Sequence, residues 1–313
     1  MELLTKNCLL EVPPGTVEEI RKLHGLDKPG RLVEAVNILQ DWIQKEDHII
    51  KKDFSREYLE KSLISCKGSV EKAKKQIDIS CTMRTLIPKF FNKTNVKKDL
   101  EDILDIVRLL PLSKITKEYH RVIIIKIKSN NFTSESMIQY YRFLIILIEY
   151  IKVNDYVNGF IIIADYRQLN ILDIMAKLNT VELQQFISIA IEGYGARLKS
   201  LNVLSDSKAI ELLIKTFKQF FSEKIGNRIH VHPTLEDLHK FVPKEILPVE
   251  YGGKERSIEE LFKDCIEDLS SDKHVEYMKM MSKACTDETK RNAVKFNEEY
   301  MGMPGAFRNL SVD

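Results

Sequence analysis

Apolar residues after residue 92 alternate between short unbroken runs and longer stretches with helical spacing. The unbroken runs predict strands at 121–128, 159–166, 197–204 and 228–232. The stretches with apolar residues every three or four positions predict helices at 134–151, 180–192 and 207–225. Strands that alternate with helices indicate a mainly parallel sheet with helices packed on its faces. We therefore expect an α/β fold in this part of the chain.

Residues 1–92 show helical spacing and no strand pattern. One stretch places its apolar side chains at Leu32, Val33, Val36, Leu39 and Ile43. Ser55 and Ser69 each precede a further helical stretch, where a hydroxyl group can cap the free N–H groups of the first turn. The second of these stretches, from Val70 to about Phe90, is basic, and solvent exposure is the simplest interpretation of its lysines, Lys67, Lys72, Lys74 and Lys75.

The C-terminal residues 256–313 are rich in charged residues, and we expect them to be mostly helical. We predict three parts: a helical module at 1–92, an α/β domain at 93–255, and a tail at 256–313. The tail is expected to pack back on the domain, with Phe307 as its anchor.

Composition excludes several classes of protein. With 48 basic and 46 acidic residues the net charge is +2, so no overall field favours nucleic acid. The five cysteines form no CxxC pair, which argues against a disulfide framework or a zinc site. The N-terminus has no basic start followed by an apolar run, and the longest apolar runs are too short to span a bilayer. We expect a cytoplasmic protein that associates with membranes only at times.

Enzyme motifs are absent from the sequence. There is no GxGxxG, no GxxxxGK[ST] and no GxSxG. Asp165 ends a predicted strand, where a capping or salt-bridge role is the favoured interpretation. His230 and His232 share one face of a strand and with His239 make a candidate metal site, but ordinary histidines beside a turn explain them better. We expect no enzyme activity, no cofactor and no metal.

Several segments together resemble a known family. They are Tyr58–Ile77 and Thr82–Phe91 in the helical module, the amphipathic stretch 207–225, Arg-Ile-His-Val-His at 228–232, and Ile-Leu-Pro-Val-Glu-Tyr-Gly-Gly at 246–253. This combination is similar to the CRAL-TRIO lipid-binding family, in the branch of the alpha-tocopherol transfer and cellular retinaldehyde-binding proteins and its insect members. The resemblance implies a protein that holds one hydrophobic molecule in a cavity closed by a movable helix.

The resemblance also implies which residues bind the lipid. Those expected on helix 134–151 and strand 159–166 are Tyr141, Leu144, Ile148, Phe160 and Ile162. Those expected on helix 180–192 and just after it are Phe186, Ile189, Ala190 and Tyr194. The movable helix would contribute Ile210, Leu213, Ile214 and Phe217. At ~1.5 Å per residue this helix, 207–225, would be roughly 28 Å long, although its periodicity alone also fits an ordinary crossover helix.

A second site implied by the resemblance is a basic cleft for a phosphoinositide headgroup. The matching residues are Arg197, Lys199, Lys224 and Arg228. Arg197 and Lys199 are two residues apart on a strand and so point the same way. A further arginine of the family, in the helical module, is replaced here by the segment Ile64 to Cys66. Four solvated surface charges are the alternative interpretation.

We therefore expect a carrier that transfers a retinoid, carotenoid, tocopherol-like or other terpenoid lipid between membranes, coupled to transient contact with a phosphoinositide-containing membrane surface. One alternative is a phosphoinositide-binding signalling adaptor without a cargo lipid. Another is an enzyme on a degenerate α/β sheet, which would need a cleft with convergent titratable groups. The sequence leaves open the ligand, the target membrane and the oligomeric state.

Overall fold

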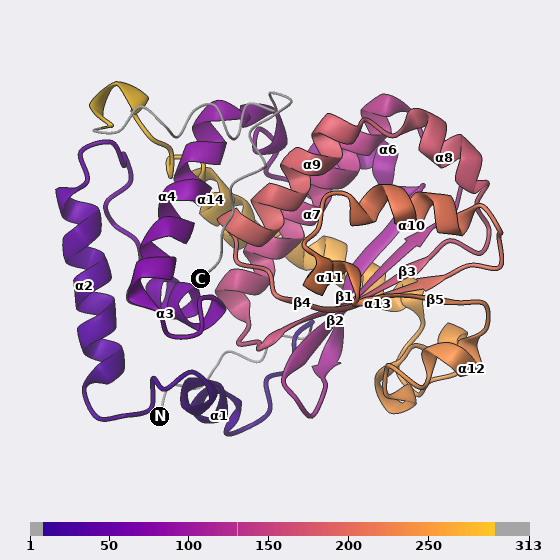
Figure 1. The fold of residues 1–313 in the computed structure, drawn as a ribbon, viewed down its shortest axis with the longest axis horizontal. Helices are drawn as coiled ribbons and strands as arrows, with labels where there is room; N and C mark the ends of the chain where they lie inside the picture. The colour runs from indigo at the N-terminus through magenta and orange to yellow at the C-terminus, as the bar shows by residue number, and fades with distance from the viewer. Residues whose placement is uncertain (1–8, 130, 292–313) are drawn as a thin grey trace.

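A five-stranded sheet forms the centre of the fold (Figure 1). The computed structural model describes residues 9–129 and 131–291. The strands, in their order across the sheet, are β1 (Val107–Ile115), β2 (His120–Ile127), β3 (Gly159–Asp165), β4 (Leu198–Leu204) and β5 (Ile229–His232). β1 runs antiparallel to β2, and every other neighbouring pair is parallel. The expected mainly parallel sheet is confirmed, and its four predicted strands match β2 to β5.

Strand β1 was not predicted. Its sequence, VRLLPLSKI, carries Pro111 in an otherwise apolar run. Proline has no N–H to donate to a neighbouring strand, so it argues against a strand in the middle of a sheet. β1 lies at the edge of the sheet, where one side of the strand needs no partner, and its pairing with β2 shifts register between Pro111 and Ile115. The position at the edge makes the proline compatible with the strand.

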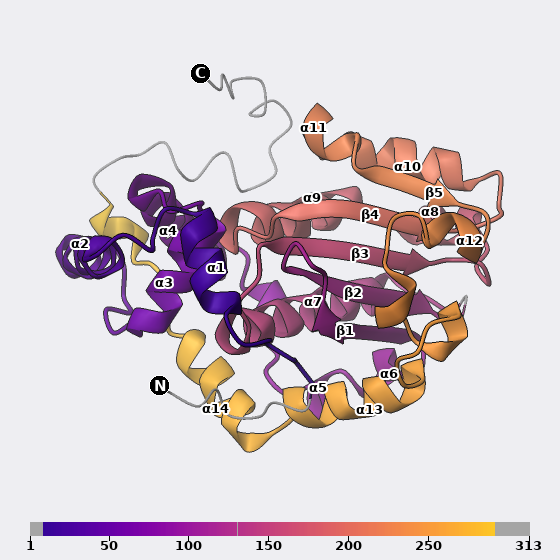
Figure 2. The same cartoon turned by 90° about the horizontal axis from the view of Figure 1, so that it is seen from below.

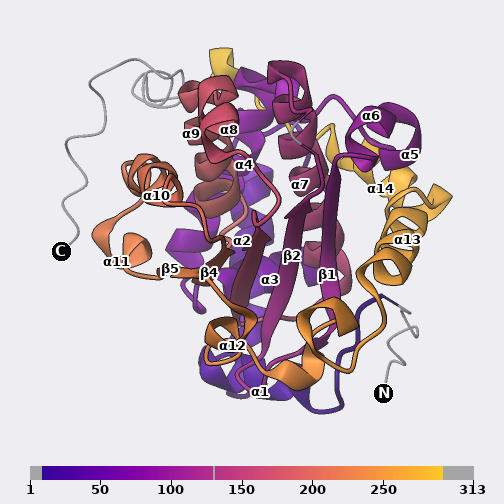
Figure 3. The ribbon, with the colours of Figure 1, turned by 90° about the vertical axis from the view of Figure 1, so that its right-hand side faces the viewer.

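Helices cover the sheet on one face. They are α7 (Ser134–Asn154), α8 (Ile171–Lys177), α9 (Thr180–Ser188), the π-helical turn η2 (Ile189–Gly193), α10 (Ile210–Lys218) and α11 (Glu223–Gly226). α12 (Leu235–Leu238) lies on the other side of the sheet from α10 (Figures 1 and 3). α7 is the longest helix of this layer, and its apolar side chains meet the isoleucines of β2 and β3.

The N-terminal helices form a module at one end of the sheet (Figures 1 and 2). They are α1 (Thr16–Leu23), α2 (Arg31–Lys45), α3 (Arg56–Ser65) and α4 (Val70–Leu86), followed by the short turn η1 (Pro88–Phe90). The two predicted caps are confirmed, since Ser55 Oγ accepts from Tyr58 N at 3.1 Å and Ser69 Oγ accepts from Lys72 N at 3.4 Å. The module has its own apolar core, distinct from the core beside the sheet.

The remaining described elements connect or flank these layers. They are α5 (Val96–Asp99), α6 (Glu101–Leu104), η3 (Lys244–Ile246), η4 (Val249–Tyr251), α13 (Ile258–Leu269), α14 (Asp272–Met281) and η5 (Glu288–Lys290). α13 packs against β1 at the edge of the sheet, and α14 packs against α7 (Figure 3). Phe307 lies outside the described residues. The division of the chain at residues 92 and 255 stays a prediction.

A buried polar cluster joins the helical module to the α/β part. Arg84 on α4 pairs with Glu149 on α7, and both side chains are almost fully buried. The hydroxyl of Tyr194 donates to Glu149 at 2.7 Å and accepts from Arg84 at 2.9 Å. The hydroxyl of Tyr277, on α14, donates to the other Glu149 oxygen at 3.0 Å. Because each member has partners, the cluster fixes these elements against one another.

Candidate functional site

An apolar cavity of about 210 Å³ lies between the sheet and helices α7 to α10. Alternate residues of β2, Ile123, Ile125 and Ile127, line it because successive side chains on a strand face opposite sides. α7 contributes one stripe of apolar side chains, from Met137 to Ile151. At ~1.5 Å per residue this stripe is roughly 21 Å long, so the cavity follows most of the helix.

The wall of the cavity carries no charged group. Every lining side chain is aliphatic or aromatic, and the hydroxyls of Tyr140, Tyr141 and Tyr166 are its polar atoms. The ring of Tyr141 stacks on Phe186 with their centroids 4.9 Å apart, and its buried hydroxyl has no hydrogen-bond partner. Burial raises the pKa of Tyr166 to about 12, so this hydroxyl stays neutral at physiological pH. Such a wall suits a hydrophobic guest with few polar atoms.

Nine of the thirteen predicted lipid-binding residues line this cavity. They are Tyr141, Leu144, Ile148, Phe160, Ile162, Phe186, Ala190, Leu213 and Phe217. They come from α7, β3, the α9–η2 segment and α10, so the fold brings together all four elements that were expected to form the wall. Their contact with a lipid stays a prediction.

The other four predicted residues lie outside the cavity wall. Ile189 is buried in η2, which packs against α4 of the helical module. Tyr194 is held away by its bonds to Arg84 and Glu149. Ile210 and Ile214 are buried on α10, four residues apart on one side of the helix, and they pack into the surrounding core. Helical spacing correctly identified buried positions. It could not show whether a buried side chain packs in the solid core or lines the cavity.

The predicted 207–225 helix is broken in the structure. α10 has nine residues, which at ~1.5 Å per residue gives roughly 14 Å, about half of the expected length. The chain then turns, Ser222 adopts an extended conformation, and a single helical turn follows as α11. The apolar pattern continues through the break, because Phe221 also lines the cavity. The spacing therefore predicted the apolar face correctly and the continuity of the helix wrongly.

Sequence reasoning missed a large part of the wall. The isoleucines of β2 were assigned only to a buried strand. Ile174 of α8 and Leu178, which directly follows α8, were not assigned at all. The alternation in β2 identifies one face of the strand but does not show whether that face meets a helix or an empty space. α8 has only seven residues, too few for a clear helical period.

A basic cleft of about 580 Å³ lies between the helical module and the end of α10–α11. Each of the four predicted headgroup residues lines it, namely Arg197, Lys199, Lys224 and Arg228. The module adds three lysines, Lys67, Lys72 and Lys75. The expected solvent exposure of these three lysines is confirmed, and the structure adds that they stand on the wall of the cleft. They lie close to the segment where the family's arginine is missing.

The cations of the cleft repel one another. Burial and then the neighbouring charges of Arg197 and Arg228 lower the pKa of Lys199. The ring nitrogen Nε2 of His24 lies 3.2 Å from the Arg197 guanidinium, and burial together with Arg197 and Lys199 lowers the pKa of His24 to about 4. A bound anion would relieve this repulsion, because an opposite charge favours the protonated form of every group around it.

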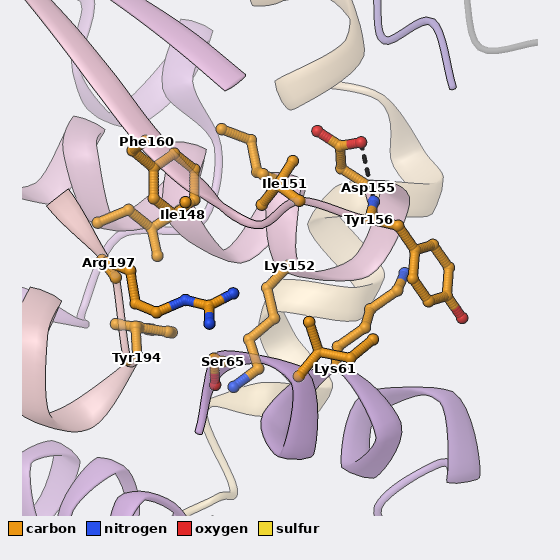
Figure 4. A pocket seen from close by; sticks show the side chains of 15 residues that line it. Lys61, Ser65, Ile148, Ile151, Lys152, Asp155, Tyr156, Phe160, Tyr194 and Arg197 are labelled. Atoms are coloured by element: carbon orange, nitrogen blue, oxygen red, sulfur yellow. Dashed lines mark hydrogen bonds between the residues drawn. The ribbon is translucent and has the colours of Figure 1, made fainter. Parts of the chain in front are cut away.

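A smaller junction pocket of about 60 Å³ lies between the cavity and the cleft (Figure 4). It shares Ile148 and Phe160 with the wall of the cavity, and Ser65 and Arg197 with the wall of the cleft. Its own distinguishing side chain is Lys152, near the C-terminal end of α7. The junction pocket therefore borders both larger spaces and is itself partly polar.

Comparison with known proteins assigns the family. Residues 108–253 match the CRAL/TRIO domain, and residues 28–100 match the Pinta-like UBA domain. The chain belongs to the CRAL-TRIO family.

Relatives of this CRAL-TRIO chain agree with the assignment. The human "Alpha-tocopherol transfer protein-like" is 28% identical over 233 residues, which cover 72% of this chain and 67% of that protein. Clavesin-2 of Rattus norvegicus is 31% identical over 98 residues, 31% of this chain and 30% of that protein. The crystal structure of Sfh5 matches with a TM-score of 0.50 over 75% of this chain and 91% of that one, at 11% identity, and so supports the fold alone.

CRAL-TRIO membership supports lipid binding and transfer as the general class of function, and members of this family are lipid-binding proteins rather than enzymes. Within residues 9–129 and 131–291, no helix combines the length and apolar character needed to cross a bilayer.

The titratable residues considered as rival sites in this CRAL-TRIO domain have structural partners. Asp165 pairs with Arg167 at 2.8 Å and accepts from the hydroxyl of Tyr251 at 3.0 Å, which confirms the predicted salt bridge. His232 Nε2 lies 3.0 Å from Asn202 Oδ1, and His239 Nε2 lies 2.8 Å from the carbonyl oxygen of Tyr251. In the described part of the chain, no three His, Cys, Asp or Glu residues are grouped to hold a metal ion.

Proposed function

We propose that the protein binds one hydrophobic small molecule in the cavity and transfers it between membranes. The observation that supports this most directly is the uncharged, aliphatic and aromatic wall along α7. Burying ~500 Å² of apolar ligand surface would contribute at most ~12 kcal/mol at ~25 cal/mol per Å². Costs of association and ordering reduce this figure, yet the remainder supports tight binding without any ion pair. Retinoids, carotenoids, tocopherol-like molecules and other terpenoid lipids fit this chemistry.

The α10 wall is the proposed gate. A cavity of about 210 Å³ is smaller than the ~300–1,000 Å³ of typical small-molecule sites, so a ligand of tocopherol size requires part of the wall to move outward. α10 contributes Leu213 and Phe217 to the cavity and exposes Leu212 to solvent. At its N-terminal end Ala209 provides no side-chain cap, so the first turn lacks one of the contacts that would fix it. An apolar outer residue also suits contact with a membrane surface.

The basic cleft is proposed to bind the phosphates of a phosphoinositide. Lys224 lies in α11, directly after α10, so a phosphate held there acts on the segment that follows the gate. Cations from two strands, from α11 and from the helical module can approach phosphate oxygens from several sides. Phosphate binding would draw α11 toward the module and thereby couple membrane contact to movement of α10.

A transfer assay tests this proposal. Phe217→Asp places a charge on the cavity side of α10, and we expect it to abolish transfer of a fluorescent retinoid or tocopherol between vesicles, because an unpaired charge is strongly disfavoured in an apolar wall. Gln219→Asp introduces the same charge two residues later on the exposed side and is expected to transfer normally. Normal transfer by Phe217→Asp would remove α10 from the mechanism.

A signalling adaptor is the alternative function, because the basic cleft could bind a phosphoinositide even if the cavity held no lipid. An adaptor would bind phosphoinositide vesicles and carry no cargo. Vesicle binding combined with complete failure to take up any apolar probe would favour it over the carrier.

A further inference from the structure

The junction pocket contains a cation that neither the cavity nor the cleft explains. Lys152 follows Ile148 by four residues and therefore continues the stripe of α7 that lines the cavity. Its side chain is half-buried between α7 and α3. Among the described residues it has no carboxylate within ion-pair distance, and its clearest contact is the ring of Tyr58, 4.4 Å from the ammonium nitrogen. A cation–π contact replaces only part of the water that a buried ammonium loses.

The acidic groups around Lys152 are already paired. Glu149, one turn earlier on α7, is bonded to Arg84, Tyr194 and Tyr277. Asp155, in the wall of the junction pocket, forms two bonds to the buried guanidinium of Arg121, at 2.7 and 2.9 Å. These carboxylates are therefore bonded to other groups, and the charge of Glu149 offsets the burial of Lys152 only in part.

The carboxylates on the other side of Lys152, in a second pocket that borders it, are also paired. There Glu57 pairs with Lys61 at 2.6 Å and Asp53 pairs with Lys51 at 2.8 Å. Burial lowers the pKa of Lys152 to about 8, although the nearby charge of Glu149 acts in the opposite direction. Since the neighbouring acids have other partners, the negative charge of a ligand would stabilise this ammonium further.

A second cation faces the junction pocket. Figure 4 shows the end of Lys152 beside Ser65 and the guanidinium of Arg197 directed toward the side chain of Lys152. Arg197 contacts His24 and, within the described part of the chain, forms no ion pair with a carboxylate. The volume of about 60 Å³ holds a small group rather than an inositol ring. Size and charge together fit one carboxylate.

We propose that the junction pocket binds the carboxylate head of an acidic lipid whose chain lies in the cavity, with Lys152 as the principal counter-charge and Arg197 at the entrance. The proposal rests on the proposed carrier function and narrows its cargo to long-chain or terpenoid carboxylic acids. The chain of such a ligand would extend along α7 from Ile151 toward Met137, in contact with apolar residues along its whole length. The head would meet the end of the cavity that adjoins Lys152 and Arg197.

The experiment compares an acid with its neutral ester. The probes are cis-parinaric acid and its methyl ester, titrated into the full-length protein and followed by fluorescence. We expect the wild type to bind the acid about tenfold more tightly than the ester, the preference that one charge-assisted hydrogen bond provides. Lys152→Met should remove this preference and leave ester affinity unchanged, whereas Lys152→Arg should retain most of it. The ester also reports on folding, since it needs only an intact cavity.

Two further measurements distinguish a lipid carboxylate from an inositol phosphate as the bound anion. They also distinguish failure of this proposal from failure of the carrier function. Lys72→Met removes a cation from the cleft alone, and we expect it to leave the acid preference intact. Soluble inositol bisphosphate should not displace parinaric acid; full displacement would assign the junction pocket to the phosphate ligand of the cleft and overturn the proposal. Equal affinity of the wild type for acid and ester, or an unchanged preference in Lys152→Met, would also overturn it while leaving the carrier function in place. Failure of both probes to bind would refute the carrier function and this proposal together.

Discussion

The cavity and the basic cleft lie next to each other but differ in the chemistry of their walls, which are apolar in the cavity and positively charged in the cleft. The cavity draws its wall from consecutive elements of the α/β part, and apolar burial is the common property of its side chains. The cations of the cleft come from three segments that are distant in the sequence, 67–75, 197–199 and 224–228. Their positive charges repel one another, and a bound anion would reduce this repulsion. Sites of the first kind exist before the ligand binds, and they select for shape and apolarity. In a site like the cleft, the clustered cations are stabilised only when an anionic ligand is bound.

The largest expected effect concerns the buried cluster around Glu149, which joins the helical module to the α/β part. Glu149→Gln leaves Arg84 charged and without a counter-ion at a position that is almost fully buried, so we expect a loss of about 3–5 kcal/mol in the free energy of unfolding. Tyr277→Phe removes one hydrogen bond from the same cluster and should cost only about 1 kcal/mol. Urea denaturation of both variants measures the difference. Equal stabilities would show that the cluster does not join the module to the α/β part.

A smaller effect is expected when the cleft alone is changed. Lys72→Glu combined with Lys224→Glu reverses one charge on each wall, and we expect the dissociation constant for phosphoinositide vesicles to rise about tenfold, since each lost contact is a charge-assisted hydrogen bond. Uptake of an apolar probe should remain unchanged. Lys215→Glu, on the exposed side of α10, is the matched control. Loss of probe uptake in the double variant would mean that cavity and cleft are not separate sites.

The smallest effect is a shift in the titration of His24. Its pKa, lowered to about 4 by burial and by the positive charges of Arg197, Lys199 and Lys67, should rise when an anion occupies the cleft, because the anion offsets those charges. Ligand affinity should therefore increase as the pH falls below the ordinary histidine value toward 4. NMR titration of the imidazole, with and without soluble inositol bisphosphate, measures the shift. A neutral cavity ligand such as the parinaric methyl ester should leave the pKa of His24 where it is, and a shift with that ester alone would contradict the separation of the two sites.

The sequence predicted those parts of the molecule that depend on local patterns. The alternation of strands and helices identified the sheet, and Ser55 and Ser69 were recognised as helix caps because capping needs only neighbouring residues. Strand β1 was missed because Pro111 contradicts a central strand and sequence does not show that the strand lies at an edge. The break after Lys218 was missed because no glycine or proline marks it.

Sites that depend on tertiary packing were predicted only in part. Periodicity cannot separate Ile214, which packs into the core, from Leu213, which lines the cavity, because both lie on the buried side of one helix. Lys67 and Lys72 are solvent-exposed as predicted, but the sequence does not show that the fold brings them to the same cleft as Lys199. Lys152 gave no signal in the sequence, since its importance depends on which neighbouring acids are already paired.

The presence of a bound apolar molecule tests the central claim most directly. The purified full-length protein would be extracted with organic solvent, and the extract measured by mass spectrometry beside that of Ala190→Phe, which fills part of the cavity with a larger side chain. We predict one equivalent of a hydrophobic molecule from the wild type, or stoichiometric uptake of an added apolar probe, and strongly reduced amounts from the variant. A wild type that yields no such molecule and takes up no probe would contradict the account.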